Sequence, residues 1–266
     1  AVGILVGIFF GKEVFGGFGR NVFNPAIVGR AFIYVCFPVE LTGQFAPAYG
    51  GFPGGFAQWG PKTMLNGMDA LTAATPMWAR RDHGFVADLS DLFLGTIGGT
   101  FDEGTRVLAA GSVGEVSALL VLIGGIYLLW TKAANWRLVS GSLGGAVVAS
   151  LFFRYILGAD GVPPLLWSLC SGAMLYACFF MVTDPVSAPN DKKAQWIYAA
   201  FIGVMIVFLR WKSVFSGAVA FAILLGNTVG PTVEMITSSK KKKKSAAKAK
   251  ETKKPGKATE TAKAAT

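Results

Sequence analysis

Long apolar runs separated by short polar segments make up most of the chain. A membrane-spanning helix needs roughly 20 mainly apolar residues. Five runs fit this requirement with their flanks: residues 113–130, 136–157, 163–182, 196–210 and 214–230. A sixth run, 22–38, is apolar apart from Asn24 and Arg30. The pattern predicts an all-α integral membrane protein.

The opening run, residues 1–11, is apolar but too short to cross a membrane. It has no basic segment or cleavage site of the kind that marks a signal peptide. It also begins without methionine. We interpret it as the second half of a helix and expect the chain to be a fragment that lacks its N-terminal helices.

Basic residues in the short loops indicate how the spans are oriented, because such residues collect on the cytoplasmic side. Alternating the spans places one set on a single side, which is then predicted to be cytoplasmic: Lys12, Arg20, Lys132, Arg137, Lys192, Lys193 and the lysine-rich C-terminus. The opposite side receives the long segment 39–112, with four basic and seven acidic residues. Arg210 and Lys212 do not follow the rule.

Composition supports a membrane location, since 53% of residues are hydrophobic and only 15% are charged. Residues 240–266 carry 11 lysines and two glutamates, so the net charge of +10 belongs almost entirely to this tail. A segment without apolar residues should be disordered. Beside a membrane it should contact anionic lipid. Without aromatic residues for stacking, it is a poor nucleic-acid arm, and we expect no nucleic-acid partner.

Four segments follow from these patterns: 1–38, with the end of one helix and the first full span; 39–112, an extracytoplasmic segment; 113–235, with five transmembrane helices; and 236–266, the tail. Two short motifs resemble each other, Asn24-Pro25-Ala26 and Asp184-Pro185-Val186. Proline-interrupted segments in paired positions are typical of inverted-repeat membrane folds with broken helices.

Several common chemistries are excluded by residue type or spacing. His83 has no ligand partner at metal-binding spacing, so no metal site is expected. Cys36, Cys170 and Cys178 are odd in number and lie in apolar runs, which excludes a disulfide-built module. No glycine-rich phosphate loop follows a strand, so we do not expect this chain to bind NADH itself.

Three stretches carry a family resemblance: residues 12–32, which begin KEVFGGFGRN; residues 111–117, GSVGEVS; and residues 179–188, FFMVTDPVSA. Together they resemble the NqrB subunit of the sodium-translocating NADH:quinone oxidoreductase over residues 1 to about 235. The RnfD subunit of the Rnf electron-transport complex is also similar. The KEVFGG and GEVS forms favour the quinone reductase.

The resemblance implies a fold of two inverted five-helix repeats, similar to urea and ammonium channels, with several helices upstream of residue 1. It also implies electron relay towards quinone, coupled to Na⁺ transport, in a multi-subunit complex of the bacterial inner membrane. An Rnf-type ferredoxin:NAD oxidoreductase is the alternative within the family. A channel or transporter without redox chemistry is the alternative from another class.

The resemblance further implies a covalent FMN. The family's attachment motif is Asp-x-x-Ser/Thr-x-Ala-Thr, and this sequence reads Asp69-Ala70-Leu71-Thr72-Ala73-Ala74-Thr75. The match places the phosphoester on Thr75, with Asp69, Thr72 and Ala74 completing the motif. Without the family, the same residues are typical of a helix start with Asp or Thr as the N-cap.

A non-covalent riboflavin is the second implied cofactor, and the family's two asparagines match Asn21 and Asn24. An amide offers both a donor and an acceptor to a ring edge. Without the family, Asn21 reads equally well as a helix cap. Arg30 follows within the same span, where an arginine must be paired. Either Asp184 or the flavin is a candidate partner.

Four acidic residues lie in or at the ends of spans and are candidates for an ion pathway: Glu13, Glu115, Asp184 and Glu234. Carboxylates and unwound carbonyls at broken helices can coordinate Na⁺. The family has an acidic residue at the positions of Asp184 and Glu234, linked to Na⁺ translocation. Glu115 also fits a first-turn acid that stabilises a helix dipole.

Overall fold

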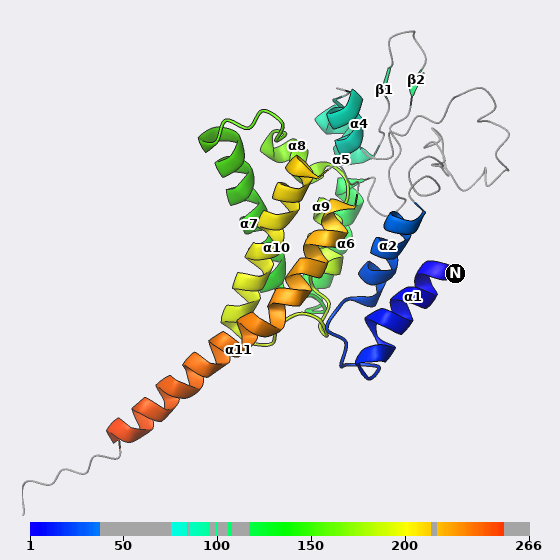
Figure 1. Cartoon of the computed structure of the whole chain (residues 1–266). Coiled ribbons are helices and arrows are strands. Elements are labelled where there is room, and N and C mark those ends of the chain that lie inside the picture. Colours follow the sequence, from blue (N-terminus) through cyan, green and yellow to red (C-terminus); the bar gives the residue numbers. More distant parts are fainter. Residues whose placement is uncertain are drawn as a thin grey trace, which may run out of the picture.

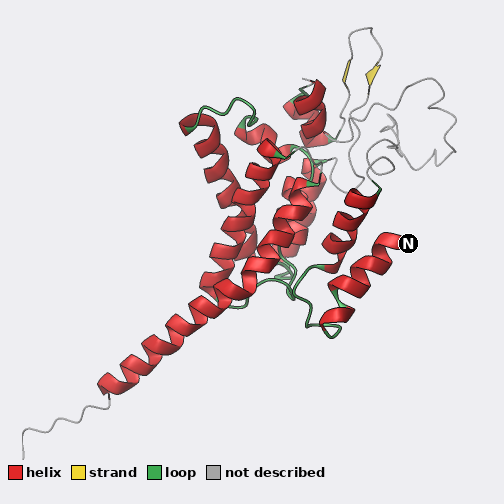
Figure 2. Cartoon of the chain, in the orientation of Figure 1, coloured by secondary structure: helices red, strands yellow, loops and turns green. Residues whose placement is uncertain are grey.

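The computed structural model of the chain describes residues 1–37, 76–83, 86–95, 99–100, 106–107, 117–213 and 217–252. These residues are mainly helical, and the protein is an all-α membrane protein, as predicted (Figure 2). The elements are α1 (Val2–Gly11), η1 (Glu13–Phe15), α2 (Pro25–Cys36), α4 (Pro76–His83), α5 (Leu89–Leu94), β1 (Gly99–Thr100), β2 (Arg106–Val107), α6 (Ala118–Trp130), α7 (Trp136–Leu151), η4 (Phe152–Ile156), α8 (Leu165–Cys170), α9 (Met174–Tyr176), η5 (Ala177–Met181), α10 (Lys192–Lys212) and α11 (Ala218–Thr252). β1 and β2 form an antiparallel pair of two residues each.

Three helices are long and apolar enough to cross a membrane: Trp136–Ile156, Lys192–Lys212 and Ala218–Ser239. They confirm the predicted spans 136–157, 196–210 and 214–230. The first combines α7 with the π-helical turn η4. In Figure 1, α7, α10 and α11 lie side by side at the centre of the bundle. Their facing side chains form the main core, in which Ile202 and Ile223 are fully buried.

Glycine allows α7 and α10 to approach closely. A Cβ atom added at Gly145 would lie against the carbonyl oxygen of Ala200 and 2.8 Å from its Cα. A Cβ at Gly203 would meet the carbonyl oxygen of Ser142. Small residues permit this kind of contact between membrane helices. The close contact expected at Gly141 and Gly145 is confirmed.

α1 and α2 form a helix pair at the edge of the bundle (Figure 1). Gly3, Gly7 and Gly11 are the buried residues of α1. A Cβ at Gly7 would lie 3.2 Å from Gly29 of α2, so backbone meets backbone at this contact. The predicted helix in residues 1–11 is confirmed. Its other face is exposed and apolar, as at Ile4, which suits contact with lipid.

The predicted continuous span 163–182 is wrong. α8 ends at Cys170, Ser171 is extended, and Gly172 has φ +60°, before α9 and η5 continue to Met181. Glycine permits this left-handed conformation without a steric penalty. The sequence contained the glycine, but apolarity alone does not distinguish a broken helix from a continuous one.

Arg210 of α10 provides donors for the carbonyl groups that this break releases. Its Nη1 donates to the carbonyl of Ser168 at 2.9 Å, and its Nη2 donates to that of Ser171 at 3.0 Å. Backbone groups freed within a membrane protein must be satisfied internally. This gives a structural reason for an arginine that does not follow the loop-charge rule.

Two further boundaries differ from the predictions. α6 begins at Ala118 rather than residue 113, because Ser117 is its N-cap and accepts from the N–H of Leu120. α11 continues to Thr252, so disorder from Lys240 onward is wrong for this part of the tail. Lysine and alanine are good helix formers, and they extend a helix already nucleated in the bundle. Residues 253–266 lie outside the described part.

Candidate functional site

The first helix break is built by the sequence Asn24-Pro25. Asn24 is the N-cap of α2, and its Oδ1 accepts from the N–H groups of Ala26 at 3.0 Å and Ile27 at 3.4 Å. Pro25 occupies the first turn, where its missing N–H costs nothing. Asn24 is thereby fixed at the point where the chain turns into α2.

Asn21 takes a different place in the same turn. It is buried, and its Nδ2 donates to the carbonyl of Phe23 at 3.0 Å. The cap that we considered for Asn21 is therefore made by Asn24. Of the two predicted flavin-binding asparagines, only Asn24 lines either of the cavities described below.

The second break is built by Asp184-Pro185 after η5. Asp184 Oδ1 accepts from the N–H of Val186 at 3.3 Å, and Oδ2 accepts from the hydroxyl of Ser187 at 2.8 Å. The turn continues to Asp191, the N-cap of α10. A carboxylate at a helix break is thus held by its own turn.

The structure brings these two breaks together at one cavity. The cavity has a volume of about 320 Å³, within the range of small-ligand sites. Its lining combines both motifs with the loop between α6 and α7: Asn24, Leu128, Ala133, Ala134, Phe180, Thr183, Asp184 and Pro185. A neighbouring cavity of about 590 Å³ shares Ala133, Ala134, Thr183 and Pro185 with it.

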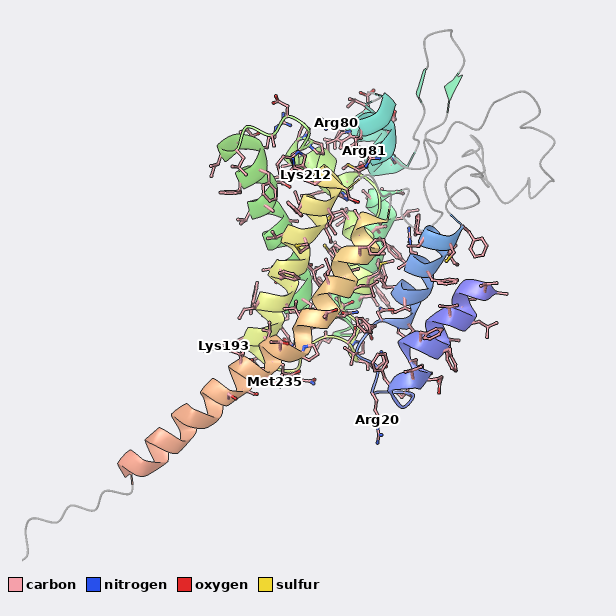
Figure 3. The ribbon with its side chains drawn as sticks, in the orientation of Figure 1. Arg20, Arg80, Arg81, Lys193, Lys212 and Met235 are labelled. Atoms are coloured by element: carbon pink, nitrogen blue, oxygen red, sulfur yellow. The ribbon has the colours of Figure 1, made fainter. Side chains whose placement is uncertain are left out.

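We call the end of the bundle that holds these cavities the cavity end. The larger cavity is lined there by Lys132, Arg137 and Gln195. In Figure 3, Arg20 and Lys193 lie toward this end of the bundle. The basic loop residues predicted to share one side therefore lie at one end of the protein; that this end is cytoplasmic stays a prediction.

A buried polar pair lies beyond Asp184, between α10 and α11. The hydroxyl of Tyr198 donates to Asn227 Oδ1 at 2.6 Å, and both residues are almost completely buried. Asp184 is close enough to Tyr198 to interact with it electrostatically. Sequence reasoning missed this pair; the signal was an asparagine inside the apolar run 214–230.

Arg30 lies on α2 and contacts Tyr34 one turn later. Its Nη2 donates to the Tyr34 hydroxyl at 3.2 Å, and its guanidinium carbon lies 5.4 Å from the ring centroid. Asp184 is also described, and the two form no ion pair. The suggestion that Asp184 pairs with Arg30 is therefore not supported by the structure.

The remaining acidic candidates in the described residues lie outside the cavity lining. Glu13 is exposed and sits 4.0 Å from the ammonium nitrogen of Lys12. Glu234 of α11 accepts from the N–H of Asn190 at 3.1 Å. Glu234 therefore connects α11 to the turn that follows Asp184, whereas Glu13 lines neither cavity.

The predicted FMN attachment motif lies outside the described residues, namely Asp69, Thr72, Ala74 and Thr75. Glu115 does as well. The described chain resumes at Pro76, the first residue of α4. Among the residues that the structure describes, no group of three or more His, Cys, Asp or Glu side chains could hold a metal ion.

The fold and the cavity define a class: an all-α membrane protein in which two interrupted helices meet at a polar cavity. The sequence model of the NQR2, RnfD, RnfE family matches residues 1–243. The chain belongs to this family, which confirms the resemblance seen in the sequence.

Curated relatives share one name, that of the NqrB subunit of Na(+)-translocating NADH-quinone reductase. The chain is 37% identical to the Azotobacter vinelandii protein over 240 residues, which cover 88% of the chain and 53% of that relative. It is 35% identical to the Ectopseudomonas mendocina protein and 34% identical to the Klebsiella pneumoniae protein, with 53% of each relative covered. The chain thus spans about half the length of the curated relatives it matches.

Proposed function

We propose that the chain is the C-terminal half of a membrane subunit in a Na⁺-translocating NADH:quinone oxidoreductase. In this role it relays electrons between a covalent FMN on Thr75 and a riboflavin near Asn21 and Asn24. Its partners are the other subunits, quinone and Na⁺. The observation that supports this most directly is the shared cavity, where Asn24 of one broken helix and Asp184 of another line the same space.

The cavity residues suit an isoalloxazine ring. Leu128 and Phe180 provide apolar surfaces, and Thr183 provides a hydroxyl. The oxygen of Asn24 is used to cap α2, which leaves its amide nitrogen as the donor for a ring acceptor. The bound flavin would supply the redox chemistry, while the protein fixes its position and electrostatic surroundings.

The ion-pathway role centres on Asp184. Its carboxylate lines the cavity and is oriented by Ser187 and by the N–H of Val186. Oxygen ligands at a broken helix are the kind that coordinate Na⁺ in transporters. Glu234 then acts less directly, by holding the turn through Asn190.

The covalent flavin is tested by in-gel ultraviolet fluorescence of the denatured full chain, expressed with an active flavin transferase. Thr75→Val should abolish a fluorescent band that survives denaturation, and Thr72→Val should retain it at reduced intensity. A band of equal intensity in Thr75→Val would place the attachment elsewhere. An inserted protein with no fluorescence at all would favour a channel or transporter without redox chemistry.

The riboflavin site is tested by comparing Asn24→Asp with Asn24→Ala. Asp keeps the capping oxygen but removes the amide donor, so it should preserve α2 and lower flavin retention. Non-covalent flavin is measured by extraction and chromatography after purification. Retention of riboflavin in both variants would remove Asn24 from the site. Dependence on quinone, rather than on ferredoxin and NAD, then separates the quinone reductase from an Rnf-type complex.

The sodium role is tested in the assembled complex by Asp184→Asn, with Asp191→Asn as the matched control. Both are aspartates that accept backbone N–H groups near α10, but only Asp184 lines the 320 Å³ cavity. Asp184→Asn should abolish Na⁺ stimulation of quinone reduction, and Asp191→Asn should keep it. Equal Na⁺ stimulation in both variants would contradict the role.

A further inference from the structure

A second basic region lies at the end of the bundle opposite the cavities. Arg80 and Arg81 of α4 and Lys212 of α10 gather there in Figure 3, far from Arg20 and Lys193. We call this the α4 end. Arginine is a specific feature here because its planar fork binds oxyanions with two parallel hydrogen bonds.

Two arginines at this end have backbone partners. Arg81 donates through Nη1 to the carbonyl of Ser213 at 2.5 Å, which ties α4 to the end of α10. Arg154, in the π-helical turn after α7, donates through Nη1 to the carbonyl of Val162 at 2.6 Å. Both side chains are thus anchored to the backbone of the bundle.

Arg80 differs from them. Its guanidinium carbon lies 5.2 Å from the ring centroid of Trp167, and the indole is fixed by a 2.9 Å hydrogen bond from Nε1 to the carbonyl of Ala87. The Nη1 atom of Arg80 is buried and has no hydrogen-bond acceptor in the described part of the chain. A buried cationic donor without an acceptor is unfavourable, even over an aromatic ring.

The charges around Arg80 increase this cost. Burial and the nearby Arg154 both lower the pKa of the Arg80 guanidinium. Among the described acidic residues at this end, Asp88, Asp91 and Asp160, none forms an ion pair with Arg80. Two neighbouring cations, one with an unsatisfied donor, form a complementary site for an anion.

We propose that Arg80 and Arg154, with Trp167 beneath Arg80, bind a phosphate ester at the α4 end of the bundle. Several acceptor oxygens on one centre can engage both guanidinium groups, and the negative charge relieves their repulsion. Two sources share this chemistry. One is the phosphodiester of a flavin on Thr75, directly before α4, which rests on the proposed function; the other is an anionic phospholipid headgroup.

The test measures how fast phenylglyoxal modifies each arginine in the purified full chain, by mass spectrometry. Arg81 serves as the exposed reference. Arg137, whose guanidinium carbon lies 5.1 Å from the Trp136 ring, controls for protection by stacking alone. With an anion bound, Arg80 should react at least about tenfold more slowly than Arg137, the scale of one charged hydrogen bond.

Three preparations distinguish the sources: flavinylated protein, Thr75→Val in phosphatidylcholine nanodiscs, and Thr75→Val in phosphatidylglycerol nanodiscs. Protection confined to the flavinylated protein assigns the site to the phosphodiester. Protection restored by phosphatidylglycerol alone assigns it to a lipid headgroup, and this result stands even where no fluorescence is found on Thr75. Arg80 reacting as fast as Arg137 in all three preparations overturns the proposal.

Discussion

Replacing Gly145 by alanine tests whether the α7–α10 contact determines the stability of the bundle. The added Cβ would meet the carbonyl oxygen of Ala200 and lie 2.8 Å from its Cα, and no rotamer change can relieve a clash with backbone. Gly144 is the matched control. It lies next in the same helix, and a Cβ there would have nothing within 4 Å.

The magnitude follows from the difference between the two variants. Alanine is favoured over glycine in a helix interior by about 1 kcal/mol, and both substitutions share this gain. Only Gly145→Ala overpacks the interface, at a cost of about 1–3 kcal/mol. Its free energy of unfolding should therefore lie about 1–3 kcal/mol below that of Gly144→Ala.

The assay is reversible unfolding in mixed micelles with increasing dodecyl sulfate, followed by far-ultraviolet circular dichroism. Gly144→Ala should unfold at the same detergent fraction as the unmodified chain or at a higher one. Gly145→Ala should unfold earlier, with the same slope. Equal unfolding free energies for the two variants would refute the inference that backbone contact between α7 and α10 limits their separation.

Three further predictions concern the helix breaks and use the same unfolding assay. Arg210→Gln should cost about 2–4 kcal/mol, because it removes charged donors from the two carbonyls at the α8 break; an unchanged stability would mean that other groups satisfy them. Gly172→Ala should cost about 1–2 kcal/mol at φ +60°, against a gain for Gly144→Ala. Asn24→Ala should cost about 1 kcal/mol through loss of the α2 cap, and Asn24→Asp close to nothing.

Much of the fold was predictable because a membrane imposes simple rules. Helices α10 and α11 coincide with apolar runs of spanning length, and short glycine spacings such as Gly141 to Gly145 indicated close helix contacts. The break at residues 171–173 was not predictable from apolarity. A broken helix remains as apolar as a continuous one, and its partner Arg210 lies 39 residues beyond Ser171 in sequence.

The candidate site was predictable in its motifs but not in its geometry. Asn24-Pro25 and Asp184-Pro185 stood out because proline interrupts a helix at a fixed position. Nothing in the sequence stated that they line one cavity. Arg30 shows the limit most clearly: an intramembrane arginine required a partner, and the structure gives Tyr34 rather than Asp184.

Polar chemistry in this bundle is concentrated where helices are interrupted. Asp184 lies at one break, Asn24 caps another, and Arg210 bonds to the carbonyls of a third. An uninterrupted helix uses all its interior backbone groups, so only a break offers free carbonyls and N–H groups to ions, cofactors or side chains. The breaks at Asn24 and Asp184 meet at one cavity, whereas the third is closed by Arg210. The first two are therefore the places where a ligand can bind, and the third maintains the shape of the bundle.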